Sequence, residues 1–173
     1  MIIAPPSAAE YAPYYHTYIS KVTSTDLIEA LRQNQADFVS FIKSLPGDKG
    51  DYKYAEGKWT VKEVIIHLTD AERIFAYRAL SFARNDKTDL AGFDENTYVP
   101  ESFAHSRSLT DVIHEWESVR AASLTLFKSF SAETALRTGF ANGKEISVRA
   151  LGYIIVGHTM HHQGVIADRY LVK

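Results

Sequence analysis

Cysteine is absent from this chain of 173 residues. Its absence excludes disulfide bonds, thiolate metal ligands and a nucleophilic sulfur supplied by the protein itself. Any thiol chemistry would therefore use a thiol that a small molecule brings in.

Long apolar runs and an excess of positive charge are also absent. No stretch approaches the roughly 18 apolar residues that a membrane span needs, and the first twenty residues lack the basic and apolar segments of a signal peptide. We therefore expect a cytoplasmic protein without a membrane partner. The net charge is -2 and the pI is near 6.4, with lysine and arginine scattered along the chain. This distribution gives no electrostatic footprint for nucleic acid, so we expect no nucleic-acid partner.

What the chain does have is helical periodicity. Hydrophobic residues make up 46% of the sequence, which is enough for one domain, 1–173, with a substantial core. Apolar residues recur with a period near 3.6 in four segments, 26–45, 60–84, 109–130 and 148–171, whereas strand-like alternation is nearly absent. Thr60 and Glu63 have the spacing of a capping box at the second segment. The pattern predicts an all-α protein.

Three further segments lie outside these helices. Tyrosines at i, i+3, i+4 and i+7 predict a short N-terminal helix with an aromatic face, expected to pack against the other helices rather than contact a ligand: Tyr11, Tyr14, Tyr15 and Tyr18. The segment 85–107 is an unusually long connection, a feature that is often functional. Asn142 and Gly143 form a turn signal that indicates a small hairpin.

Three histidines suggest a metal site. His158 and His162 are four residues apart, so their imidazoles share one helix face, and His67 lies on the apolar face of the second segment. A lone histidine on such a face is more often an ordinary core residue. Three buried imidazoles without a shared ligand, however, would leave polar nitrogens that cost about 1 to 3 kcal/mol each when unpaired. Three ligands leave one coordination position open, as in a reactive zinc site.

Other residues are candidates for the surroundings of this metal. His161 competes as a ligand through its i, i+3 spacing to His158, but its place at the edge of the apolar face favours a cofactor-binding role. Asp70 and Glu72 are candidate catalytic acids, with ion-paired carboxylates as the alternative. Arg78 and Tyr98 are candidate cofactor-binding residues, and Arg78 is expected to pair with a carboxylate or with the acid group of a substrate rather than to contact the metal.

A protease of the H-E-x-x-H type is not supported. His158 and His162 have the outer spacing of that motif, but Thr159 stands where its mechanism needs a glutamate as general base.

Four motifs together resemble the DinB-like superfamily, including its metal-dependent hydrolase and thiol-transferase branches. They are KWTVKEVIIHL at 58–68, DAER at 70–73, FDEN at 93–96 and GHTMHHQG at 157–164. The resemblance implies a four-helix bundle with up-down-down-up connectivity and frequent homodimers. It also implies a Zn²⁺ or Ni²⁺ site on His67, His158 and His162, with a low-molecular-weight thiol as a further cofactor.

The functional hypothesis is a metal-dependent enzyme. A divalent ion on three histidines would activate a small-molecule thiol or water for transfer to a small electrophilic substrate. The alternatives are a metal-dependent hydrolase and a non-catalytic metal-binding or sensing module. A carboxylate or tyrosine near the open coordination position would favour an enzyme, and Asp70, Glu72 and Tyr98 are the candidates.

Overall fold

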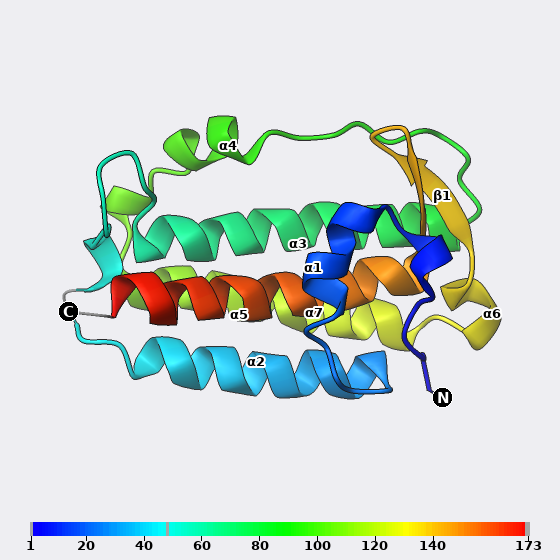
Figure 1. Ribbon diagram of the computed structural model, residues 1–173, viewed down its shortest axis with the longest axis horizontal. Helices are drawn as coiled ribbons and strands as arrows, with labels where there is room; N and C mark the ends of the chain where they lie inside the picture. Colours follow the sequence, from blue (N-terminus) through cyan, green and yellow to red (C-terminus); the bar gives the residue numbers. More distant parts are fainter. Residues whose placement is uncertain (1, 48, 172–173) are drawn as a thin grey trace.

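Four long helices form the body of the protein in the computed structural model, which describes residues 2–47 and 49–171 (Figure 1). They are α2 (Leu27–Lys43), α3 (Val61–Ala83), α5 (Leu109–Lys128) and α7 (Val148–Val165), and α7 continues as the π-helical η5 (Ile166–Tyr170). The all-α prediction is confirmed, and the ends of the four predicted segments lie within two residues of the observed ones.

The helices follow the up-down-down-up order. Figure 1 shows α2 and α7 running in one direction along the bundle and α3 and α5 in the other. Because α3 and α5 are parallel, the chain must return along the whole bundle between them. This crossover contains α4 (Glu95–Glu101) and a 3-10 turn, η4 (Ala104–Ser106).

Each long helix begins at a side chain that caps its free backbone N–H groups. At α3 the cap is the predicted capping box, in which Thr60 accepts from the Glu63 backbone and Glu63 accepts from the Thr60 backbone. The other three caps are Asp26, Ser108 and Ser147. The local sequence therefore fixes where all four helices start.

A buried polar layer crosses the middle of the bundle. Arg120 of α5 donates two hydrogen bonds to the carboxylate of Glu72 of α3, at 2.8 and 2.9 Å. Its remaining donors reach Asn34 of α2 at 2.7 Å and Thr159 of α7 at 3.2 Å. The layer thus takes one side chain from each long helix. It separates two apolar clusters, since buried apolar residues lie on either side of it along every helix.

A hairpin ties the crossover to the bundle. Strands β1 (Thr138–Ala141) and β2 (Lys144–Ser147) follow a short helix, α6 (Ala132–Ala135), and pair antiparallel. The turn residues Asn142 and Gly143 have φ values of 53° and 67°, as the predicted Asn-Gly turn requires. Leu90 of the crossover pairs with this hairpin through hydrogen bonds to Phe140 and Asn142.

The N-terminal segment packs across α7. It contains two 3-10 turns, η1 (Ala8–Glu10) and η2 (Pro13–Tyr15), and the one-turn helix α1 (His16–Ile19). A Cβ atom on Gly157 would lie 2.1 Å from the carbonyl oxygen of Tyr18. Glycine at this position therefore lets α1 approach the backbone of α7 directly.

Among the described residues, no helix combines the length and the apolar character that crossing a membrane requires.

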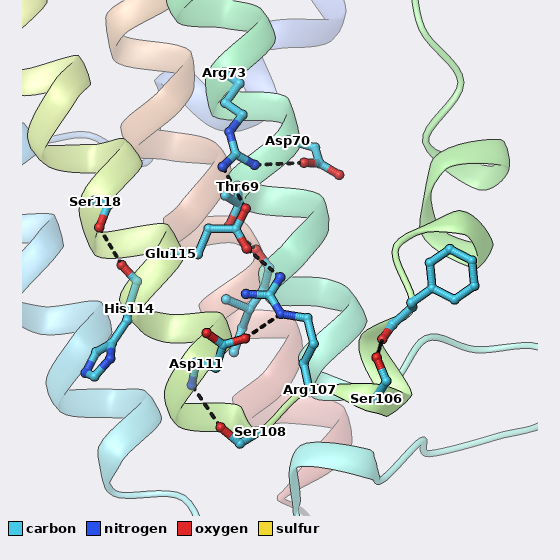
Figure 2. A network of polar contacts seen from close by, with 12 residues as sticks. Thr69, Asp70, Arg73, Ser106, Arg107, Ser108, Asp111, His114, Glu115 and Ser118 are labelled. Carbon is cyan, nitrogen blue, oxygen red and sulfur yellow. Dashed lines mark hydrogen bonds and ion pairs between the residues drawn. The ribbon is translucent and has the colours of Figure 1, made fainter.

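A second set of charges lies outside the core, between α3 and α5 (Figure 2). Arg73 bridges Asp70 at 3.3 Å and Glu115 at 2.6 Å, and Arg107 pairs with Asp111 and Glu115. These side chains are partly exposed, whereas Arg120 and Glu72 are 0% and 2% exposed. Water screens the outer network, so its contribution to stability is small.

We predict that Glu72→Gln lowers the free energy of unfolding by about 3 kcal/mol, because it leaves the buried Arg120 guanidinium without its counter-charge. The matched control is Asp70→Asn, which removes a partly exposed partner of Arg73 on the same helix and should cost less than about 1 kcal/mol. Urea denaturation of the three proteins measures both effects. Equal losses in the two variants would contradict the central role given to the polar layer.

Candidate metal centre

Three imidazoles converge between α3 and α7. His67 comes from α3, and His158 and His162 come from successive turns of α7. Their ring centroids lie 4.9 Å (His67 to His158), 5.1 Å (His67 to His162) and 4.7 Å (His158 to His162) apart. The Nε2 atoms of His67 and His158 are 3.1 Å apart, and one ring nitrogen of each histidine lies within 4.8 Å of the other two. The structure therefore brings together the three predicted ligands.

The polar layer positions these rings. Thr159 directly follows His158, and its hydroxyl contacts both Arg120 and the carbonyl oxygen of Ile155. Since Glu72 fixes the rotation of α3 through the same arginine, the layer sets the faces that both helices present to each other. His67 lies on the α3 face that α7 covers.

Burial keeps the three imidazoles neutral. It lowers the pKa of His67 to about 4, against a smaller opposing effect of the Glu95 charge. Burial, together with neighbouring histidines, lowers the pKa of His162 to about 3 and that of His158 well below its usual value. Neutral imidazole is the form that binds a metal, so the cluster is ready for a cation at pH 7.

The donor set fits a divalent transition metal. Three imidazoles suit Zn²⁺ and Ni²⁺. Two nitrogens bound to a tetrahedral zinc ion lie about 3.3 Å apart, close to the 3.1 Å between His67 and His158. The Nδ1 atom of His162 is buried without a hydrogen-bond partner, which is costly unless something else engages this ring.

A cavity of about 290 Å³ opens beside the cluster. Its walls are largely aromatic, with contributions from Tyr15, Tyr18, Trp59, Phe75 and Phe93. Polar side chains also face it, namely Arg78, Glu95, Asn142 and His161. The three histidines therefore border a space in which a small ligand can reach them.

The chain is similar in sequence to one protein family. A family profile described as the DinB superfamily matches residues 30–166. The chain belongs to the DinB superfamily. No curated protein matches the sequence. The family assignment thus rests on a match that covers all four long helices except the first residues of α2.

Two solved structures share the fold of this DinB-superfamily protein. YfiT from Bacillus subtilis, described as a probable metal-dependent hydrolase with an unusual four-helix bundle topology, superposes with a TM-score of 0.73. Its identity is 17%, over 82% of each chain. A mycothiol-dependent maleylpyruvate isomerase gives a TM-score of 0.66 and 10% identity over 87% of this chain. The match spans only 61% of the isomerase, so part of that protein has no counterpart here.

The N-terminal tyrosines pack against the bundle as predicted, through Tyr11, Tyr15 and Tyr18. Tyr11 is buried and contacts His16, but Tyr14, Tyr15 and Tyr18 line the cavity. The Tyr18 ring lies 5.0 Å from that of His158, and its hydroxyl is 2.8 Å from that of Tyr14. Burial raises the pKa of Tyr18, so the hydroxyl stays protonated. Gly157 brings α1 onto the same turn of α7 that carries His158, so tyrosines that pack against the bundle also border the histidines.

Two of the three predicted binding residues face the cavity. His161 packs against the Tyr18 ring at 5.4 Å, and Arg78 reaches the cavity from two turns beyond Ala71 on α3. Tyr98 does not line the cavity. It is 46% exposed and packs against Phe93, with the ring centroids 5.7 Å apart. Its predicted binding role is therefore not supported by its position.

Asp70 and Glu72 are not brought to the histidines. Glu72 is engaged by Arg120 in the polar layer, and Asp70 turns outward to Arg73, as Figure 2 shows. Neither lines the cavity. The prediction of catalytic acids at these positions is corrected to the alternative of ion-paired carboxylates, because each has a nearer cationic partner.

The acid that does face the cavity is Glu95, which the sequence reasoning did not single out. It is the first residue of α4, a helix capped by Asp94, whose carboxylate accepts from the Asn96 backbone at 2.9 Å. The available signals were the unusual length of the crossover and the FDEN motif within it. Neither could say which of the adjacent acids points inward.

We predict that the metal-free protein loses stability as the pH falls from 7 to 5. Unfolded histidines titrate near pH 6.5, whereas the folded pKa is about 4 for His67 and about 3 for His162. Between these values the unfolded chain binds more protons, so the free energy of unfolding decreases by about 1.4 kcal/mol per pH unit for each such histidine. Urea denaturation in the presence of a chelator measures this slope.

In the variant His67→Gln, the slope of the unfolding free energy against pH should be smaller by the contribution of one histidine, because glutamine does not titrate in this range. The exposed His114→Gln is the matched control and should keep the slope of the original protein. Identical slopes in all three proteins would contradict the buried neutral state of His67.

Proposed function

We propose that this DinB-superfamily protein is a metal-dependent enzyme in which His67, His158 and His162 hold a Zn²⁺ or Ni²⁺ ion. The observation that supports this most directly is that three neutral imidazoles border an aromatic cavity. A purely structural zinc site is closed by four protein ligands, whereas a catalytic one keeps a position for a small molecule.

The ion, when bound, would act as a Lewis acid and lower the pKa of a thiol or water that occupies its open position. The protein's own residues supply the remaining functions. Glu95 is the carboxylate in the cavity and would accept the proton that this group releases. Tyr18 keeps its proton and can donate a hydrogen bond to a ligand. Aromatic side chains supply the apolar part of the cavity wall.

The reaction we propose is transfer of a small-molecule thiol to a small electrophilic substrate. The chain has no cysteine, so the thiol must come from outside. Support comes from the isomerase of the same fold, which is described as mycothiol-dependent. Metal-dependent hydrolysis is the second candidate, because Glu95 could equally accept a proton from water and YfiT is described as a probable hydrolase.

The purified protein should bind about one divalent ion per chain. His67→Ala should weaken binding by more than about 100-fold, since even loss of a residue that merely supports a ligand costs 10-fold to 100-fold. His161→Ala should weaken it less than His162→Ala. Metal analysis after dialysis and titration with a metal indicator measures these effects, with the exposed His105→Ala as the control. Equal metal content in the original protein and the variant lacking all three histidines would contradict the site.

Thiol binding tests the proposed reaction. Titrating the Co²⁺-substituted protein with glutathione, bacillithiol or cysteine should produce a sulfur-to-metal charge-transfer band, because the thiolate enters the open position. His158→Ala should abolish the band. Glu95→Gln should still bind the metal, but the band should appear only at higher pH, because the proton acceptor is missing. If no thiol changes the spectrum while the protein cleaves an ester or amide, hydrolysis is the better assignment.

A further inference from the structure

Arg78 is a buried cation without a carboxylate partner. It is 4% exposed, and within residues 2–47 and 49–171 it forms no ion pair. One of its terminal nitrogens donates to the carbonyl oxygen of Ala91 at 2.8 Å, but Nε is buried without a hydrogen-bond partner. The other fully buried arginine, Arg120, is by contrast matched to Glu72 on two oxygens. An unmatched buried guanidinium is costly, which points to an anion that binds it.

This cation lies on the wall that carries the histidines. His67, Ala71, Phe75 and Arg78 follow one another along a single face of α3, and all four line the cavity. Side chains on a helix lean toward its N-terminus, so Arg78 leans toward His67. The Phe75 ring lies between the histidines and Arg78. Its centroid is 6.3 Å from that of the His158 ring and 5.8 Å from the guanidinium carbon of Arg78.

The charged groups that line the cavity are separated along the direction from His67 to Arg78. Glu95 acts on the histidine end, where its charge opposes the lowering of the His67 pKa. The group that acts on Arg78 is the Tyr15 hydroxyl, which opposes the lowering of the Arg78 pKa by burial. Tyr15 is itself protonated, since burial raises its pKa. Within residues 2–47 and 49–171, no carboxylate therefore neutralises the guanidinium end of the cavity.

We propose that Arg78 binds the carboxylate of a small organic acid, whose apolar body lies against the Tyr15 and Phe75 rings and whose other end faces the histidines. Arginine suits this role because its planar guanidinium can pair with both oxygens of a carboxylate. The rings of Tyr15 and Phe75 pack edge to face, with their centroids 6.4 Å apart, and form one apolar wall of the cavity. At about 290 Å³ the cavity has room for a small molecule only. Arg78 is thus a specificity-determining residue that selects acids.

That this acid is the substrate of the enzyme rests on the proposed function. The reactive atom of the acid would be separated from its carboxylate by about the width of one aromatic ring and would lie next to the metal centre. Binding of the acid itself, however, needs no metal. It can therefore be measured on protein that has been freed of metal by a chelator.

The probe is 3-phenylpropionate, compared with its neutral analogue 3-phenylpropanamide in calorimetric titrations of the metal-free protein at pH 7.5. The acid should bind about ten-fold more tightly or better, as expected for a charge-assisted hydrogen bond. Arg78→Gln should remove this preference, and Arg78→Lys should retain part of it because the charge remains. Arg84→Gln is the matched control, since Arg84 is an exposed arginine at the end of the same helix.

Thermal unfolding of each variant checks that loss of binding does not reflect loss of the fold, and the lysine variant keeps a donor for Ala91. No binding of the acid, equal binding of acid and amide, or a preference that survives Arg78→Gln would overturn the proposal. Competition with glutathione identifies the source of the carboxylate. If glutathione displaces the probe only when Arg78 is present, the acid group belongs to the thiol rather than to the electrophile, and the assignment to the substrate is overturned.

Metal analysis of the same variants separates this inference from the proposed function. Arg78→Gln should bind metal like the original protein. Normal metal binding without acid preference refutes only the role of Arg78. An acid preference without metal binding refutes the metal-dependent reaction instead.

Discussion

The buried ion pair between Glu72 and Arg120 is the interaction on which the rest of the structure depends. Arg120 of α5 reaches the other three long helices, through Glu72 on α3, Asn34 on α2 and Thr159 on α7. Breaking a buried pair of this kind is costly because it leaves one charge uncompensated, and the hydrogen bonds of Arg120 to three other helices favour a single arrangement of the bundle. Fixing the rotation of α3 and α7 also fixes where their histidines point.

The parallel direction of α3 and α5 has the second large consequence for the site. It requires a crossover along the bundle, and this crossover runs beside the cavity, where it contributes Phe93 and Glu95. Ala91 of the same segment accepts a hydrogen bond from Arg78, and Leu90 is paired with the hairpin. The connectivity of the bundle thus supplies the acid that the long helices themselves do not bring to the histidines.

The sequence predicted what depends on local spacing. Periodicity and caps located the four helices, and the interval between His158 and His162 placed two imidazoles on one face. It did not predict what depends on pairing across the bundle. Glu72 and Arg120 are 48 residues apart, and nothing in either helix alone shows that they meet. Glu95 was missed for the same reason. The homodimer and the absence of nucleic-acid partners stay predictions.

The most direct test of the account is a crystal structure of the zinc-loaded protein with anomalous diffraction recorded at the zinc edge. Metal binding by the three histidines predicts one strong peak about 2.0 to 2.1 Å from a ring nitrogen of each of His67, His158 and His162, with the remaining side open to the aromatic cavity. A peak at other residues, or a fourth protein side chain that closes the coordination sphere, would contradict it.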